Sequence, residues 1–289
     1  KIAVYDFETG GLKNGVNNIT EIAIVVIDME TLKIIDKYNS LILPKMFLNH
    51  IDADPRKAAK DLFKSLGEKH PDTGIKTLKF GEKSIGPHDV NLLEAHIEAF
   101  VKYLNPLDNI LTLADYAHLP KELKAIAKAY YNYTYTPEAL SLTGISSEMI
   151  IKKGVPEEVV MAEVKAFLEK HTEGNCRPVL AGHNIKKFDN PFFHTICDRN
   201  GMSLDKMVNL PQCVDTIELA KFMWTELENY TLGSCANALG IVLEGAHRAL
   251  ADTNVNAEVL VKMYKNLRGY GESSPNSGEL SKRVFKFNF

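Results

Sequence analysis

The chain has few cysteines for its length, and they lie far apart. Four occur among 289 residues, with no C-x-x-C pair: Cys176, Cys197, Cys213 and Cys235. This spacing argues against a cysteine-based zinc site and against a disulfide framework. It favours free thiols in a reducing, cytoplasmic environment.

Long hydrophobic runs and phosphate-binding glycine motifs are also missing. No apolar stretch approaches the roughly 20 residues that cross a bilayer, so we expect no membrane association. Neither G-x-x-x-x-G-K-[ST] nor G-x-G-x-x-G occurs. The classes of nucleotide-binding protein that depend on those two loops are therefore excluded.

An excess of positive charge is the third absence. The chain has 34 Lys and Arg against 37 Asp and Glu, which gives a formal net charge of −3. This excludes a protein that grips nucleic acid through global positive charge, but it leaves room for a local basic groove.

The composition is otherwise that of a globular protein, with 45% hydrophobic and 25% charged residues. Apolar runs at 2–5, 21–28 and 33–43 predict three strands in succession. Strands followed by strands alternating with helices indicate an α/β fold, a mixed sheet flanked by helices. In the second half we expect a short strand at 177–181 and helices at 156–171, 189–200, 215–225, 231–239 and 248–267.

Residues 45–133 interrupt this pattern. Helix starts at Asp54-Pro55, Asp89 and Pro120 precede apolar residues at helical spacing, so we expect a mostly helical insertion. Within it, residues 56–83 hold 8 basic and 4 acidic residues, which fits one wall of a strand-binding groove or a solvated helix face. The predicted organisation is a core of 1–44 plus 134–269, the insertion 45–133, and a linker and tail at 270–289.

Two carboxylates stand at the end of the first predicted strand. Asp6 and Glu8 are separated by one residue, so both project from the same face of the strand. Adjacent acids are costly to keep ionised unless cations lie between them, which favours divalent metals with oxygen ligands. A D-x-E pair also occurs by chance on surfaces, but here Gly10 and Gly11 follow and allow close approach of a ligand to the backbone.

Two further clusters carry acids. Asp189 lies where a loop passes into a helix, a position typical of ligands in α/β folds and equally of a helix N-cap. His247 and Asp252 are five residues apart, about 140° on an ideal helix. They converge only if His247 lies on the loop before the helix and Asp252 on the helix face that points inward.

The three clusters together resemble the DEDDh 3′-5′ exonucleases of the ribonuclease H-like superfamily, a group that includes the proofreading exonuclease subunit of bacterial DNA polymerase III. The resemblance covers roughly residues 1–44 and 134–267. It rests on Asp6-Phe7-Glu8-Thr9-Gly10-Gly11-Leu12, on His183-Asn184 with Phe188-Asp189, and on His247 followed by Asp252.

This resemblance implies a ribonuclease H-like sheet and a site for two Mg²⁺ or Mn²⁺ ions. Asp6, Glu8, Asp189 and Asp252 would be the metal ligands, and His247 would be the general base. The residues that would contact the substrate near its 3′ end are Thr9, Gly11, Leu12, Asn184 and Phe188.

The function implied is metal-dependent 3′-5′ hydrolysis of single-stranded or frayed DNA in proofreading or repair. An exoribonuclease of the same superfamily is the first alternative, and a catalytically silent nucleic-acid-binding module is the second. The tail at 282–289 alternates polar and apolar residues. It fits either an edge strand or a docking peptide for a polymerase, clamp or single-strand-binding protein.

Overall fold

A computed structural model of the chain describes most of the sequence. The described residues are 1–44, 46–47, 54–80, 83–104, 110–111, 119–120, 123–127, 135–242 and 247–269. The predicted linker and tail at 270–289 lie outside them. Among the described helices, none is both long and apolar enough to cross a membrane.

The chain divides into two compact units, each described here by itself. The first unit consists of Lys1–Glu8, Ile19–Ile42 and the chain from Glu158 onward. The second consists of Thr9–Asn18 and Leu43–Glu157. The second unit therefore holds the predicted insertion together with neighbouring segments of the chain.

A mixed sheet forms the centre of the α/β fold, with the strand order β11-β10-β1-β2-β3-β9. β1 pairs with β10, and β10 with β11, in parallel, whereas β2 and β3 are antiparallel. The predicted mixed sheet is confirmed. Its six strands are β1 (Ile2–Thr9), β2 (Ile19–Asp28), β3 (Lys33–Leu43), β9 (Val155–Pro156), β10 (Val179–Gly182) and β11 (Asn209–Asp215).

The strand β11 was not predicted from the sequence. Its residues, NLPQCVD, include a proline and two amides and are mostly half-buried or exposed. Proline and polar residues weaken the strand signal, and they are tolerated here because β11 lies at the edge of the sheet. Pairing with β10, rather than local sequence, makes this segment a strand.

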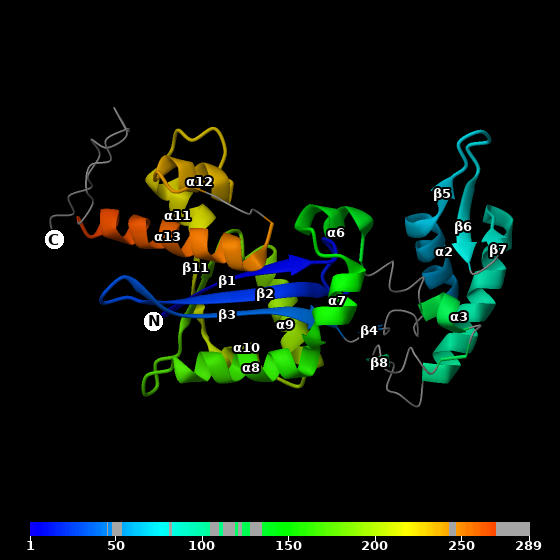
Figure 1. Ribbon diagram of the computed structural model, residues 1–289, viewed down its shortest axis with the longest axis horizontal. Coiled ribbons are helices and arrows are strands. Elements are labelled where there is room, and N and C mark those ends of the chain that lie inside the picture. Colours follow the sequence, from blue (N-terminus) through cyan, green and yellow to red (C-terminus); the bar gives the residue numbers. More distant parts are fainter. Residues whose placement is uncertain are drawn as a thin grey trace. The chain divides into compact units, whose positions relative to one another are not determined.

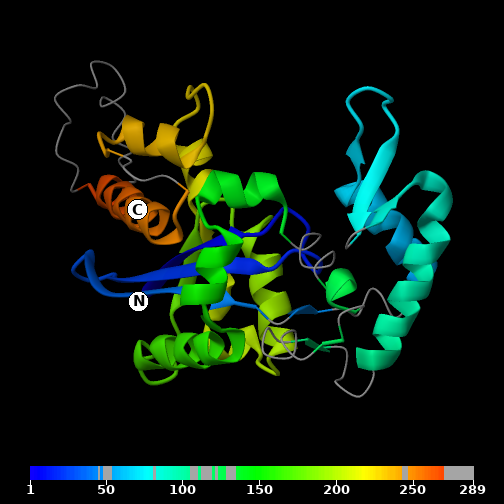
Figure 2. The ribbon, with the colours of Figure 1, turned by 45° about the vertical axis from the view of Figure 1, so that its right-hand side comes forward.

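Helices cover both faces of this sheet (Figures 1 and 2). On one face, Ala257 and Leu260 of α13 pack against Ile2 and Val4 of β1. The helices α8 and α9 lie on the other face. The helices of this part of the chain are α8 (Glu157–Lys170), α9 (Asp189–Arg199), α10 (Leu204–Met207), α11 (Thr216–Met223), α12 (Leu232–Ala238) and α13 (Ala249–Leu267).

The alternation of side chains along β1 decides what each face of the sheet carries. Tyr5 and Phe7 point to the α9 side, where each ring centroid lies 5.3 Å from that of Phe193. Asp6 and Glu8 alternate with them and so project to the α13 side. The aromatic cluster thus anchors the strand that presents the two acids.

The second unit combines helices with short strands. The predicted helix start at Asp54 is confirmed, since its carboxylate accepts a hydrogen bond of 3.0 Å from the Lys57 amide. Residues 123–127 are helical, as expected after Pro120. The described elements are α2 (Pro55–Leu66), α3 (Val90–Leu104), α6 (Pro137–Thr143), α7 (Ser147–Lys153), the 3-10 helix η1 (Pro87–Asp89), β4 (Met46–Phe47), β5 (Glu68–Lys69), β6 (Lys76–Phe80), β7 (Lys83–Ile85) and β8 (Ile110–Leu111).

The strands of this unit are an addition to the predicted helical insertion. β5, β6 and β7 form an antiparallel sheet, and Leu78, Phe80 and Ile85 from it join the core between α2 and α3. Two to five residues per strand give too short an alternation to be recognised from the sequence.

The close packing after β10 yields a stability prediction. A Cβ atom at Gly182 would lie 2.1 Å from Cγ2 of Ile185 and 2.9 Å from the backbone oxygen of Tyr5. Gly182→Ala should therefore lower the free energy of unfolding by about 1–3 kcal/mol. Gly86→Ala is the control, because its Cβ would meet only Asp89 Oδ2, at 3.4 Å. Urea denaturation measures both, and equal midpoints for the two variants would contradict this account.

Candidate active site

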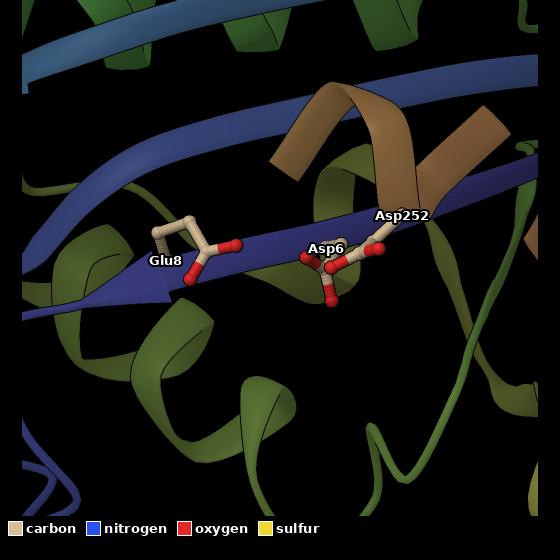
Figure 3. A group of neighbouring side chains, drawn as sticks. All are labelled: Asp6, Glu8 and Asp252. Atoms are coloured by element: carbon tan, nitrogen blue, oxygen red, sulfur yellow. The ribbon is translucent and has the colours of Figure 1, made fainter. Parts of the chain in front are cut away.

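Three carboxylates from distant parts of the chain meet above β1. Asp6 and Glu8 project from this strand, and Asp252 reaches toward them from the first turn of α13 (Figure 3). One oxygen from each of the three carboxylates lies within 4.8 Å of the other two. Asp252 therefore lies on the inward-pointing face of its helix, as expected from the sequence.

Burial and mutual repulsion dominate the electrostatics of this cluster. Burial raises the pKa of Asp6 well above its usual range, and the neighbouring carboxylates of Asp189 and Glu8 raise it further. Burial, followed by repulsion from Asp252, raises the pKa of Glu8 to about 8. Burial also raises the pKa of Asp252, although a hydrogen bond from the His247 amide opposes this. Ionising all the acids together thus requires added positive charge.

Asp189 stands at the start of α9 and is 3% exposed. Its carboxylate accepts a hydrogen bond of 3.3 Å from the backbone amide of Phe7, between the two acids of β1. Burial raises its pKa to about 7. The alternative role as helix N-cap does not hold, because the cap position is Phe188 and Asp189 is the first helical residue.

His247 lies on the loop just before α13, as its convergence with Asp252 requires. Its φ is +66°, in the left-handed region that non-glycine residues seldom adopt. Its backbone amide donates a hydrogen bond of 3.0 Å to Asp252 Oδ2. The residue itself is exposed to solvent. This hydrogen bond ties His247 to the acidic cluster while its side chain stays accessible.

Sequence reasoning missed an ion pair that holds the start of α13. Glu21 of β2 is 1% exposed, and its carboxylate accepts hydrogen bonds of 3.0 and 2.8 Å from Nε and one terminal nitrogen of Arg248. It accepts a third, of 3.1 Å, from the Ala249 amide. The available signal was an acid inside the apolar run 21–28, which implies a buried partner.

Asn184 and Phe188, two of the predicted substrate-binding residues, lie on the loop between β10 and α9. Asn184 is exposed with φ of +63°, and its backbone amide donates a hydrogen bond of 2.8 Å to Asp215 Oδ1. Asp215 also accepts from the amides of Lys186 and Ile217, so this buried acid organises the loop. The Phe188 ring is half-buried, with its centroid 5.2 Å from that of Phe192.

The other three predicted substrate-binding residues lie at the end of β1 (Thr9) and just after it (Gly11 and Leu12), and all three belong to the second unit. The Thr9 hydroxyl donates a hydrogen bond of 2.7 Å to the backbone oxygen of Gly11. A Cβ atom at Gly11 would lie 2.6 Å from the side chain of Asn17, so only glycine fits there. Leu12, the next residue, is 83% exposed.

The donor set suits a hard divalent cation. Asp6, Glu8, Asp189 and Asp252 offer oxygen ligands alone, which Mg²⁺ and Mn²⁺ prefer. The nearby guanidinium of Arg248 is engaged by Glu21, so the cluster has a surplus of negative charge for a cation to offset. The residues present therefore fit a divalent metal centre.

Comparison with known proteins relates part of the chain to an exonuclease family. Residues 120–260 match the exonuclease family RNase_T. The matched residues include Asp189 and Asp252, and the mixed α/β sheet of the chain is the fold of the solved exonuclease I structures described below.

Part of the chain is similar in sequence to bacterial DNA polymerases. The chain is 32% identical to PolC-type DNA polymerase III of Listeria monocytogenes over 129 residues, which are 45% of this chain and 8% of the relative. It is 36% identical over 124 residues to PolC-type DNA polymerase III of Latilactobacillus sakei, again 8% of the relative's length. The chain thus corresponds to a small part of these polymerases.

Solved structures share the fold at low sequence identity. An E. coli exonuclease I complex with a dT13 oligonucleotide matches with a TM-score of 0.52 and 16% identity, over 91% of this chain and 41% of that chain. Exonuclease I of Methylocaldum szegediense matches with a TM-score of 0.51 and 14% identity, over 97% of this chain and 41% of that chain.

The raised carboxyl pKa values predict how stability depends on pH without metal. Protons bind more tightly to the folded chain than to the unfolded chain, so this stabilisation is complete below about pH 4. It is lost as pH rises toward the pKa of Glu8, about 8. In chelator, we expect a lower melting temperature at pH 8 than at pH 5, and added Mg²⁺ should raise it at pH 8. Glu8→Gln should flatten the pH dependence, and a wild-type protein whose melting temperature rises from pH 5 to pH 8 would contradict this.

The ion pair between Glu21 and Arg248 predicts a non-additive pair of substitutions. Arg248→Ala leaves a buried carboxylate unpaired and should cost about 3 kcal/mol of unfolding free energy. Adding Glu21→Gln should recover part of this loss, because the neutral amide tolerates burial better than an unpaired charge. Arg177→Ala is the control, since this arginine is exposed and donates a hydrogen bond to the backbone oxygen of Asp205. Urea denaturation of the wild type, the two single variants Arg248→Ala and Glu21→Gln, and the double variant tests the coupling, which is absent if the two losses simply add.

Proposed function

We propose that this chain hydrolyses phosphodiester bonds from the 3′ end of single-stranded or frayed DNA, releasing nucleoside 5′-monophosphates in replication proofreading or repair. The observation that carries the proposal is the convergence of Asp6, Glu8 and Asp252 within 4.8 Å. The choice of DNA is supported by relatives that are DNA polymerases and by exonuclease I structures that hold dT13 and dA16 oligonucleotides.

In this proposal, Asp6, Glu8, Asp189 and Asp252 hold two divalent cations, Mg²⁺ or Mn²⁺. Such a pair, when bound, lowers the pKa of a coordinated water and stabilises charge on the phosphate and on the leaving oxygen. The oxygen-only donor set and the surplus of negative charge support it. A solved E. coli exonuclease I complex with single-stranded DNA is described as zinc-bound, which is in keeping with a divalent metal in this fold.

His247 is the proposed general base. A neutral imidazole ring can accept a proton from the attacking water, and histidine is the side chain that most often serves as a general base. The hydrogen bond from its backbone amide to Asp252 keeps the residue beside the acids. The exposed side chain is free to approach the reacting atoms once a substrate is bound.

The loops that follow β1 and β10 are proposed to hold the 3′ end. Leu12, 83% exposed, offers an apolar side chain to the last bases. Thr9 and Gly11 present hydroxyl and backbone groups to the terminal sugar. Asn184 and Phe188 are also proposed to contact the substrate, with the side-chain amide for hydrogen bonds and the half-buried ring for stacking.

Partners and cellular setting follow from this activity. The tail at 282–289 is proposed to dock on a polymerase, clamp or single-strand-binding protein, and it lies outside the described residues. All four cysteines are free, which supports a reducing intracellular compartment.

A single assay tests the reaction and its alternatives. The protein is incubated with 5′-labelled single-stranded DNA and RNA of one sequence, in Mg²⁺, in Mn²⁺ and in chelator. We expect a DNA ladder that shortens from the 3′ end only when metal is present. Preferential digestion of RNA would identify an exoribonuclease, and binding without hydrolysis would identify a silent binding module. Internal cuts, or activity in chelator, would contradict the proposal.

The role of His247 gives a quantitative prediction. His247→Ala should lower kcat by roughly 10²- to 10⁴-fold, the usual contribution of a general base. The variant should still bind the strand, because the acids of the site are intact. His194→Ala is the matched control, since His194 is exposed on α9 and has no proposed role. Single-turnover rates for the three proteins decide the matter, and a His247→Ala rate near that of wild type would remove this residue from the mechanism.

A further inference from the structure

The helix α2 of the second unit carries a stripe of positive charge. Arg56, Lys57, Lys60 and Lys64 are all exposed, and we call these four residues the basic stripe. With about 100° between successive helical residues, the four fall within an arc of about 100°. The stripe runs for about 12 Å along the helix, from Arg56 to Lys64.

The rest of the helix surface explains why this stripe faces solvent. Ala58, Ala59 and Leu62 are buried on the opposite side of α2. They pack into a core with Leu93 and Ile97 of α3. Because these apolar residues hold the helix in one rotational position, the basic stripe is a constant feature of the surface rather than one of several orientations.

Two lysines of the adjacent sheet extend the stripe. The Lys76 ammonium of β6 donates a hydrogen bond to the backbone oxygen of Lys64, at the end of α2. Lys76 in turn stands opposite Lys69 of β5 in the antiparallel ladder. We call the stripe together with Lys69 and Lys76 the basic surface.

The basic surface has little compensating negative charge. Within the described part of the chain, no ion pair joins any of its six bases to an acid. The acids closest to it in sequence are the half-buried Asp61 and the exposed Asp54, Glu68 and Asp72, fewer than its six bases. Six like charges gathered on one side repel one another, and a polyanion that binds there relieves this repulsion. In a chain with net charge −3, such a concentration of bases points to a ligand.

We propose that the basic surface binds the phosphodiester backbone of the single strand whose 3′ end is hydrolysed, an inference that rests on the proposed function. Phosphates repeat along a strand and stay ionised, so a row of lysines and an arginine binds them without reading sequence. An acidic protein would need its carboxylates at a matching spacing, whereas any nucleic-acid strand already has regularly spaced charges.

We expect the basic surface to increase the affinity for the strand and to leave the rate of hydrolysis unchanged. The chain passes between the two units at residues 8–9, 18–19, 42–43 and 157–158, so they remain tethered whichever of them binds the strand. A strand held by one unit is present at raised effective concentration for the other. The basic surface therefore favours long strands over short ones, with no change in the rate of hydrolysis of a dinucleotide.

The test measures binding of a labelled 20-nucleotide oligothymidine over a range of salt concentrations, in an Asp6→Asn background that leaves the strand intact. The stripe variant carries Arg56→Gln, Lys57→Gln, Lys60→Gln and Lys64→Gln. We expect affinity at low salt to fall about tenfold or more, and the slope of log K against log salt to become shallower by up to about 3. The matched control replaces four exposed lysines of the first unit by glutamine, namely Lys33, Lys37, Lys165 and Lys206.

The outcomes separate this inference from the proposed function. An equal change of slope in the stripe and control variants would overturn the inference. The inference would also be overturned if the stripe variant lost binding to polyglutamate but still bound oligothymidine. That result would assign the surface to an acidic protein. Circular dichroism checks folding, and glutamine preserves helix propensity at these exposed positions. If the wild-type chain hydrolyses neither DNA nor RNA but the stripe and control variants still differ in salt slope, the proposed function is wrong and the basic surface is still a strand-binding surface.

Discussion

Repulsion among carboxylates that are withdrawn from water is the constraint on which the first unit depends. Asp6, Glu8 and Asp252 are held within 4.8 Å of one another, with Asp189 buried beside the strand that bears two of them. Each raises the cost of ionising the others, and burial adds to that cost. A fold can maintain this arrangement only if the supporting elements are rigid and the surplus charge is balanced by protons or by bound cations.

The rigidity comes from both sides of the sheet. Beneath β1, the rings of Tyr5, Phe7 and Phe193 pack together and fix the strand. Above it, the Glu21 carboxylate accepts hydrogen bonds from Arg248 and from the first amide of α13. These bonds fix the positions of Asp252 and His247. Stability is therefore concentrated in the surroundings of the acids, while the acids themselves are under electrostatic strain. This is the usual division between a functional site and its scaffold.

Each of the two units carries a local concentration of charge of one sign. Negative charge is concentrated at the acidic cluster of the first unit, and positive charge at the basic surface of the second. Two bound divalent cations would take the formal total from −3 to +1. A chain that is acidic overall is thus compatible with a polyanionic substrate, because attraction is needed only where phosphates are held and where they react.

The sequence alone determined most of the helices of the first unit and the placement of two acids of the site. Alternation in β1 put Asp6 and Glu8 on one face, and apolar periodicity placed α8, α9, α11, α12 and α13 within a few residues. These features follow from local spacing, which a sequence records directly. The edge strand β11, the short strands β5 to β7 and the ion pair between Glu21 and Arg248 were decided by tertiary structure. The partners of β11 and of the ion pair are distant in the chain, 227 positions apart for the ion pair, and no local pattern encodes such a pairing. The strands β5 to β7 pair with their neighbours along the chain but are too short to show an alternation.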